Sequence, residues 1–78
     1  MLRLSDLLKG EEGIITGFVD DGQPLSRLRD MGLLEGTPLR VVKFAPFGDP
    51  IEIKARGYYL SLRKSAARQI YIKRKSAG

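Results

Sequence analysis

Residues 51–63 read IEIKARGYYLSLR, with apolar and polar side chains alternating on both sides of an Arg-Gly pair. Alternation with a period of two places successive side chains on opposite faces of a strand. A two-residue loop whose glycine supplies a positive φ is typical of a tight hairpin. The stretch therefore predicts strands over 51–55 and 58–63, joined by Arg56 and Gly57. The side chains expected to face inward on the second strand are Tyr58, Leu60 and Leu62.

The rest of the chain is also expected to form short strands and helices. Strands are expected over 12–19, 38–44 and 69–73, a helix of about two turns over 24–31, and one helical turn over 64–68. Glycine lies after or between these segments, where a turn or a helix end needs a left-handed backbone. The glycines expected in structural turns are Gly32, Gly36, Gly48 and Gly57.

A chain of 78 residues without cysteine or histidine has neither disulfides nor the usual zinc ligands to hold it together. Its own apolar core must do so, which favours a compact fold with short connections. Closing the sheet removes exposed strand edges. We therefore expect an all-β small barrel of about five strands over residues 1–74, with a short helix inserted after the first strand. Residues 75–78 are expected to form a disordered basic tail.

Catalysis finds little support in the sequence. Without His or Cys, Ser-His and Cys-His nucleophile systems are excluded, and no glycine-rich phosphate-binding loop of the Walker type is present. The adjacent carboxylate pairs, Glu11-Glu12 and Asp20-Asp21, fall at strand ends and turns, where solvation explains them. No catalytic residue, no cofactor and no enzyme activity are expected.

Three other carboxylates could contact a hard cation through oxygen, namely Asp6, Asp49 and Glu52. Their spacing resembles no dedicated metal-binding loop. We expect no metal site, and at most weak binding of a transition-metal ion.

The positive charge is concentrated in one part of the chain. Residues 51–78 carry 8 basic groups and 1 acidic group, within a net charge of +5. Such asymmetry suits an acidic partner, a nucleic acid or an anionic surface, and it equally suits simple solubility. Basic residues also alternate with aromatics on the outward strand faces, a pattern that fits either a single-strand nucleic-acid platform or ordinary cross-strand pairing. These residues are Lys54, Arg56, Arg63, Lys73, Tyr59 and Tyr71.

The stretch APFGDPI at 45–51 places Phe47 in a turn bracketed by two prolines, which stiffen the loop. Phe47 either folds back to plug the open end of the barrel, which we favour, or protrudes as a rigid anchor for a partner. Asp49 is expected to accept a hydrogen bond from backbone within the turn, in preference to a binding role. For Leu25 and Leu28 in the helix, core packing and a docking patch are both open.

Four stretches, in order along nearly the whole chain, resemble the FeoA family: LSDLLKGEEG (4–13), RLRDMGLLEGTPLRVV (27–42), APFGDPIEIKARGYYLSLR (45–63) and AARQIYI (66–72). The resemblance implies an SH3-like barrel with a helix after the first strand. It also implies a cytoplasmic, non-catalytic adaptor of bacterial ferrous iron uptake, which acts with the FeoB-type membrane transporter and its cytosolic GTP-binding domain. A small-barrel nucleic-acid-binding protein is the alternative function.

The resemblance makes a protein partner more plausible than a nucleic acid. Apolar runs fall far short of the roughly 20 residues of a membrane span, so no membrane insertion is expected. We expect a monomer. The candidate partner contacts are Leu25, Arg27, Leu28, Phe47, Asp49 and Arg56.

Overall fold

The computed structural model describes residues 1–20 and 24–75. Five strands form one antiparallel sheet in the order β4-β3-β2-β1-β5. In chain order the elements are the 3₁₀ turn η1 (Leu4–Asp6), β1 (Glu12–Phe18), α1 (Ser26–Asp30), β2 (Pro38–Phe44), β3 (Ile51–Ala55), β4 (Tyr58–Leu62), α2 (Lys64–Ala67) and β5 (Ile70–Arg74).

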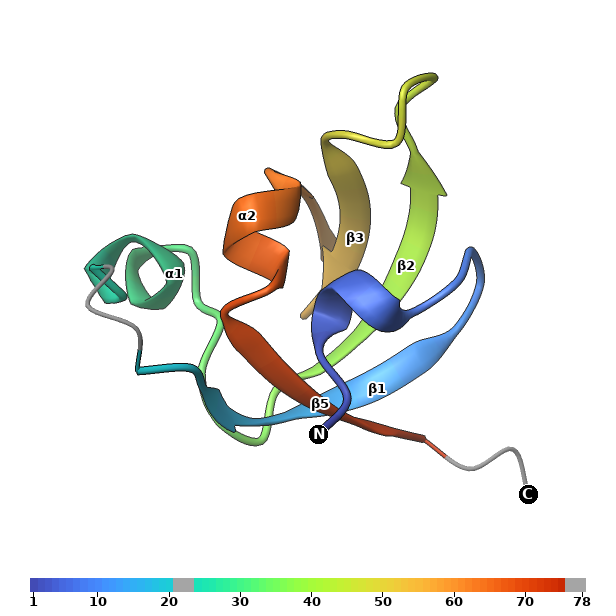
Figure 1. Cartoon of the computed structure of the whole chain (residues 1–78). Coiled ribbons are helices and arrows are strands. Elements are labelled where there is room, and N and C mark those ends of the chain that lie inside the picture. Colours follow the sequence, from blue (N-terminus) through green and yellow to red (C-terminus); the bar gives the residue numbers. More distant parts are fainter. Residues whose placement is uncertain (21–23, 76–78) are drawn as a thin grey trace.

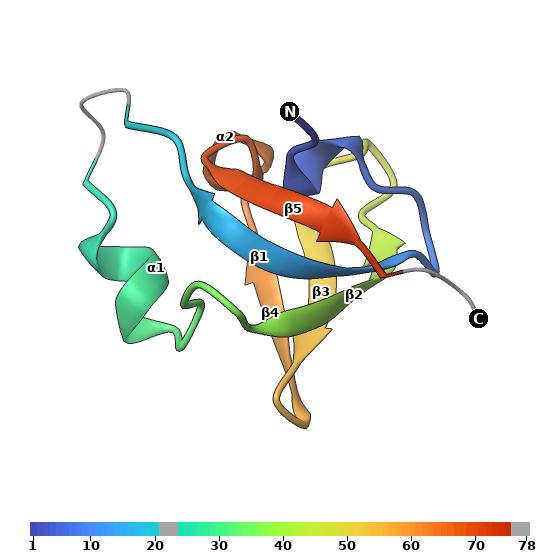
Figure 2. The ribbon, with the colours of Figure 1, turned by 90° about the horizontal axis from the view of Figure 1, so that it is seen from below.

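The sheet curls strongly, so that α2 and η1 lie on one side of it and α1 stands apart at the outer edge of the molecule (Figures 1 and 2). Register shifts between Ile15 and Gly17 and between Val41 and Lys43 mark bulges, which increase local twist and bend a strand. The edge strands β4 and β5 are connected through α2, which lies beside them at the open side of the sheet. The expected five strands with a short helix after the first strand are confirmed.

The core is built from the alternating inward positions of the strands. On β3 the exposure pattern puts Ile51, Ile53 and Ala55 inside, as the sequence alternation predicts. The helical elements contribute leucines and an alanine that cover the curled sheet. The buried apolar residues outside β3 are Leu4, Leu7, Ile15, Leu28, Leu33, Leu39, Val41, Leu62, Ala67, Ile70 and Ile72.

The hairpin at 51–62 has the expected turn. Arg56 and Gly57 have φ values of 51° and 83°, so both central residues are left-handed. The inward orientation expected for Tyr58 is wrong, because this side chain is 41% exposed. Its hydroxyl instead donates a 2.7 Å hydrogen bond to the carbonyl oxygen of Met31, just after α1. Tyr58 thereby ties the hairpin to the end of that helix.

Some boundaries differ from the expected ones. The helix begins at Ser26 rather than at Pro24, and Leu25 occupies its N-cap position. Positive φ values occur at Gly32, Gly36 and Gly48 as well as at Gly57. Of the segment 75–78, only Lys75 is among the described residues, and its backbone N–H donates to the carbonyl of Glu12 at 3.1 Å. Asp21, of the Asp20-Asp21 pair, also lies outside the described residues.

Candidate functional site: an arginine-lined groove and an aromatic loop tip

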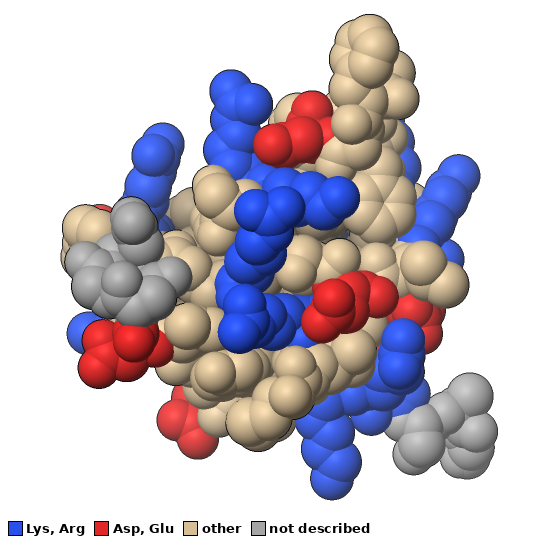
Figure 3. Space-filling model, in the orientation of Figure 1, with Lys and Arg blue, Asp and Glu red and all other residues tan. Residues whose placement is uncertain are grey.

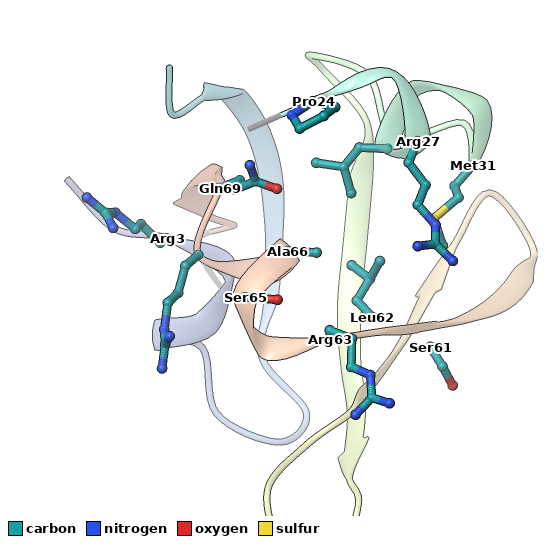
Figure 4. Close-up of a pocket in the computed structure, with 12 residues that line it drawn as sticks. Arg3, Pro24, Arg27, Met31, Ser61, Leu62, Arg63, Ser65, Ala66 and Gln69 are labelled. Carbon is teal, nitrogen blue, oxygen red and sulfur yellow. The ribbon is translucent and has the colours of Figure 1, made fainter. Parts of the chain in front are cut away.

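A groove of about 870 Å³ lies between α1 and the segment that contains the end of β4 and α2. In Figure 4, Pro24, Arg27 and Met31 lie on one side, Ser65, Ala66 and Gln69 lie on the other, and Leu62 points into the space between them. The apolar residues that line the groove are Pro24, Leu28, Met31, Leu62 and Ala66. Leu28 and Leu62 are buried core residues, so the floor of the groove is the edge of the barrel core.

Four arginines line the same groove: Arg3, Arg27, Arg63 and Arg68. No Asp or Glu is among the lining residues, and none of the four takes part in an ion pair within residues 1–20 and 24–75. Figure 3 shows Lys and Arg side chains in a band over α2 and η1, with acidic residues beside it. The groove therefore combines an apolar floor with positive charge that no carboxylate of the described lining balances.

The second candidate feature is the loop between β2 and β3. Phe47 at its tip is 99% exposed, so the expectation that it plugs the barrel is wrong. The loop extends beyond the end of the sheet (Figure 1). Leu4 of η1 and Leu7, which follows it, are by contrast fully buried in the core.

Asp49 does accept a backbone hydrogen bond, but its donor is not in the turn as expected. Oδ1 of Asp49 lies 2.9 Å from the backbone nitrogen of Lys64, the first residue of α2. A carboxylate at this position satisfies one of the unpaired N–H groups at the start of a helix. Asp49 thus connects the aromatic loop to the element that forms one wall of the groove.

The six expected contact residues do not form one cluster. Arg27 and Leu28 line the groove, and Leu25 is half-buried against the core. Phe47 and Asp49 belong to the loop. Arg56 lies in the hairpin turn, where its guanidinium donates to the hydroxyl of Thr37 at 3.3 Å.

Most of the groove residues lie outside the expected contact set, among them Arg3, Met31, Arg63, Ala66 and Arg68. The sequence did place Met31 on the same helix face as Leu28, because the two residues are three positions apart. Arg3 reaches the site only through the pairing of the N-terminal segment with β5, a tertiary contact with no local signature.

The basic-aromatic pattern is divided between separate parts of the sheet. Lys54 and Tyr59 are cross-strand neighbours, with the ammonium 5.5 Å from the ring centroid. Tyr71 is half-buried on β5, at the other edge of the sheet, with the Arg3 guanidinium 5.9 Å from its ring. These side chains serve cross-strand and local packing, and they do not form a continuous stacking track for a nucleic acid.

The three carboxylates considered for a cation are also dispersed. Asp6 accepts from the backbone N–H of Arg3, Asp49 accepts from that of Lys64, and Glu52 pairs with Lys43 at 3.6 Å. Among the described residues, no group of three or more potential metal-ligating side chains occurs. No helix in that part of the chain is long and apolar enough to cross a bilayer.

Comparison with known proteins finds matches to FeoA proteins along nearly the whole chain. The sequence profile of the FeoA domain matches residues 2–74. The Fe(2+) transport protein A/Fe(2+) transporter FeoB fusion protein of Porphyromonas gingivalis is 32% identical over 71 residues, which are 91% of this chain and 8% of that relative. The chain thus spans less than a tenth of the length of this curated relative.

Solved structures give the same fold. The FeoA-like protein from Clostridium acetobutylicum superimposes with a TM-score of 0.90 at 32% identity, covering 99% of this chain and 90% of that one. FeoA of Stenotrophomonas maltophilia in complex with zinc, described as a prokaryotic SH3 domain protein, matches with a TM-score of 0.79 at 22% identity. That match covers 94% of this chain and 91% of the other, and it shows the fold alone.

Proposed function

Because the chain belongs to the FeoA domain family, whose members are non-catalytic accessory domains implicated in ferrous iron transport, we propose that it binds the cytosolic part of a FeoB-type transporter. In this role the protein performs no chemistry of its own. It contributes a rigid surface that contacts the transporter and alters its activity.

The observation that carries this proposal is the fusion protein, in which a segment similar to this chain is covalently joined to FeoB. Covalent linkage holds two modules at a high effective concentration, which is useful when the modules act on one another. A separate chain of the same family would replace the linkage with a binding surface.

Phe47 is the best candidate anchor on that surface. Its ring is 99% exposed, and it lies between Pro46 and Pro50, whose fixed φ angles restrict the loop. Exposed rigid aromatics lose little conformational entropy on binding and are frequent among residues that dominate interfaces. The hydrogen bond from Lys64 to Asp49 further fixes the loop against α2.

The test is a titration of the purified cytosolic GTP-binding part of the FeoB-type transporter from the same cells against this protein. Phe47→Ala should weaken binding at least about tenfold and leave the thermal midpoint unchanged, since the ring contacts no core residue. Tyr59→Ala is the matched control, because it removes an exposed aromatic from a different surface. Absence of binding by the unmodified protein would contradict the proposed function. Equal losses in the two variants would contradict only the role of Phe47.

The remaining proposals concern the form in which the protein acts. We propose that residues 1–74 are the functional domain, that the protein acts in the cytoplasm, and that it is a monomer when unbound. Sedimentation over a range of concentrations tests the last of these.

A further inference from the structure

We infer that the groove between α1 and α2 binds a short acidic segment of the partner that carries at least one aliphatic side chain. The inference rests on the proposed function and specifies which part of the transporter's cytosolic region makes the contact. It assigns the groove a role separate from that of the loop tip at Phe47.

Charge complementarity points to an acidic occupant. Arg27 and Arg63 are exposed residues of the lining, and neither is in an ion pair with a carboxylate of the described residues. Guanidinium groups bind carboxylates through paired hydrogen bonds and are less strongly hydrated than ammonium groups, so they suit such a contact. Since the described residues of the lining include no Asp or Glu, an acidic segment would supply the carboxylates that pair with these arginines.

The floor points to an aliphatic side chain on the same segment. Between the arginines, half-buried Met31 and Ala66 line the groove, and the buried side chains of Leu28 and Leu62 form its floor. Methionine is flexible and polarizable, which lets it adapt to the shape of an apolar partner. Figure 4 shows Leu62 and Ala66 directed into the space in front of α1, where an inserted side chain would meet them.

The same lining argues against a nucleic acid in this groove. No Phe or Tyr is among the lining residues, whereas single-strand sites stack bases on aromatic rings. The guanidinium of Arg3 lies over the ring of Tyr71, 5.9 Å from its centroid. Figure 4 places Arg3 on the far side of α2 from α1. Arg27 and Arg63 are therefore the arginines best placed to contact the segment.

The experiment uses the full chain and overlapping peptides that cover the transporter's cytosolic part. Peptides that bind should carry net negative charge and at least one Leu, Ile, Met or Val, and their affinity should fall as salt rises. The double variant Arg27→Glu/Arg63→Glu should lose about tenfold or more of this affinity. Arg40→Glu/Lys54→Glu makes the same change in net charge on paired residues of β2 and β3 outside the groove, and it should bind nearly as the unmodified protein does.

Ala66→Leu gives a second test that leaves the charge unchanged. A larger side chain at this position fills the groove and should also weaken peptide binding about tenfold, with the thermal midpoint showing that the barrel remains folded. If the charge-reversed double variant binds the peptides weakly but Ala66→Leu binds them normally, the arginines attract the peptides at long range and not within the groove. That result would overturn the groove assignment.

Other outcomes separate this inference from the proposed function. If the intact cytosolic part binds the charge-reversed protein normally but Phe47→Ala poorly, the association stands and the groove inference is wrong. Tighter binding of a single-stranded oligonucleotide than of any acidic peptide would also overturn it. Self-association of the protein alone that is abolished by Ala66→Leu would identify a second copy as the occupant and overturn it likewise.

Discussion

At the turn between β3 and β4, two successive residues have backbone conformations that most side chains avoid. Gly57 has a φ of 83°, and no heavy atom other than its chain neighbours lies within 4 Å of the position that a Cβ would take. Any cost of a side chain there is therefore conformational and not steric crowding by a neighbour. A β-branched residue is the least tolerant of this conformation.

We expect Gly57→Val to lower the free energy of unfolding by about 1–3 kcal/mol, the usual scale of such backbone strain. Urea denaturation measures it. Arg56→Asn is the control in the same turn, because asparagine tolerates a positive φ, and it should change the stability by less than about 1 kcal/mol. A valine variant as stable as the unmodified protein would show that the turn adopts another conformation.

At the scale of elements, β1 is the strand on which the sheet depends. It pairs with β2 on one side and with β5 on the other, and both of its glycines lie within these ladders. At Gly13 the neighbouring strand approaches so closely that a Cβ would collide with the side chain of Ile72 and lie 3.1 Å from the carbonyl oxygen of Lys73. At Gly17, by contrast, the nearest atom would be Cδ2 of Tyr71 at 3.9 Å, an ordinary contact.

The two positions should therefore respond differently to the same substitution. Gly13→Ala should destabilise the protein by about 1–3 kcal/mol, because β1 and β5 must separate to admit the methyl group. Gly17→Ala should be neutral or stabilise by up to about 1 kcal/mol, since it restricts the unfolded chain without a clash. Thermal melting of both variants compares them directly. Equal losses at the two positions would mean that the pairing of β1 with β5 is looser than the structure indicates.

At the scale of the whole molecule, the N-terminal segment is tied to β5 by polar contacts. The carboxylate of Glu11 accepts a hydrogen bond from the backbone N–H of Leu8 at 2.7 Å, and Nε of Arg74 lies 2.7 Å from its other oxygen. The hydrogen bond from Arg74, followed by that from Leu8, holds the pKa of Glu11 below its ordinary value of 4.5. The guanidinium of Arg74 has a correspondingly raised pKa.

A lowered folded-state pKa means that Glu11 stabilises the protein when it is ionised. The contribution is fully present above about pH 4.5 and is lost as the pH falls through the lower pKa of the folded state. Glu11→Gln should therefore melt at a lower temperature than the unmodified protein at neutral pH. The two should converge in acid. Because the pair is at the surface, added salt should reduce the neutral-pH difference, and a difference that persists unchanged at low pH would contradict this role.

Local patterns in the sequence were sufficient to predict the positions of the strands, though not their order in the sheet, because alternation and turn chemistry act between near neighbours. The hairpin around Gly57 and the inward Ile51 and Ile53 are examples. Tyr58 was misassigned because the carbonyl of Met31, which binds its hydroxyl, reaches it only in the folded chain. The same holds for Phe47, since alternation does not determine whether a loop folds over the core or away from it.

The groove, too, could be predicted only in part from the sequence, because it forms only in the folded chain. The sequence indicated an excess of positive charge and a helix with apolar residues, and Arg27 and Leu28 were among the expected contacts. That Arg63 faces the same groove follows from the way α2 is placed at the open side of the sheet. No spacing along the chain encodes that arrangement.

The pairing of β1 with β5 also has a consequence for folding kinetics. The β3–β4 hairpin joins residues that are near in sequence, whereas Gly13 pairs with Arg74, almost the full length of the described chain away. Bringing such distant segments together lowers the entropy of the chain before the stabilising contacts between them can form. The hairpin is therefore expected to form early and the β1–β5 ladder late. During synthesis, the edge of β1 that β5 will cover stays unpaired until β5 has left the ribosome.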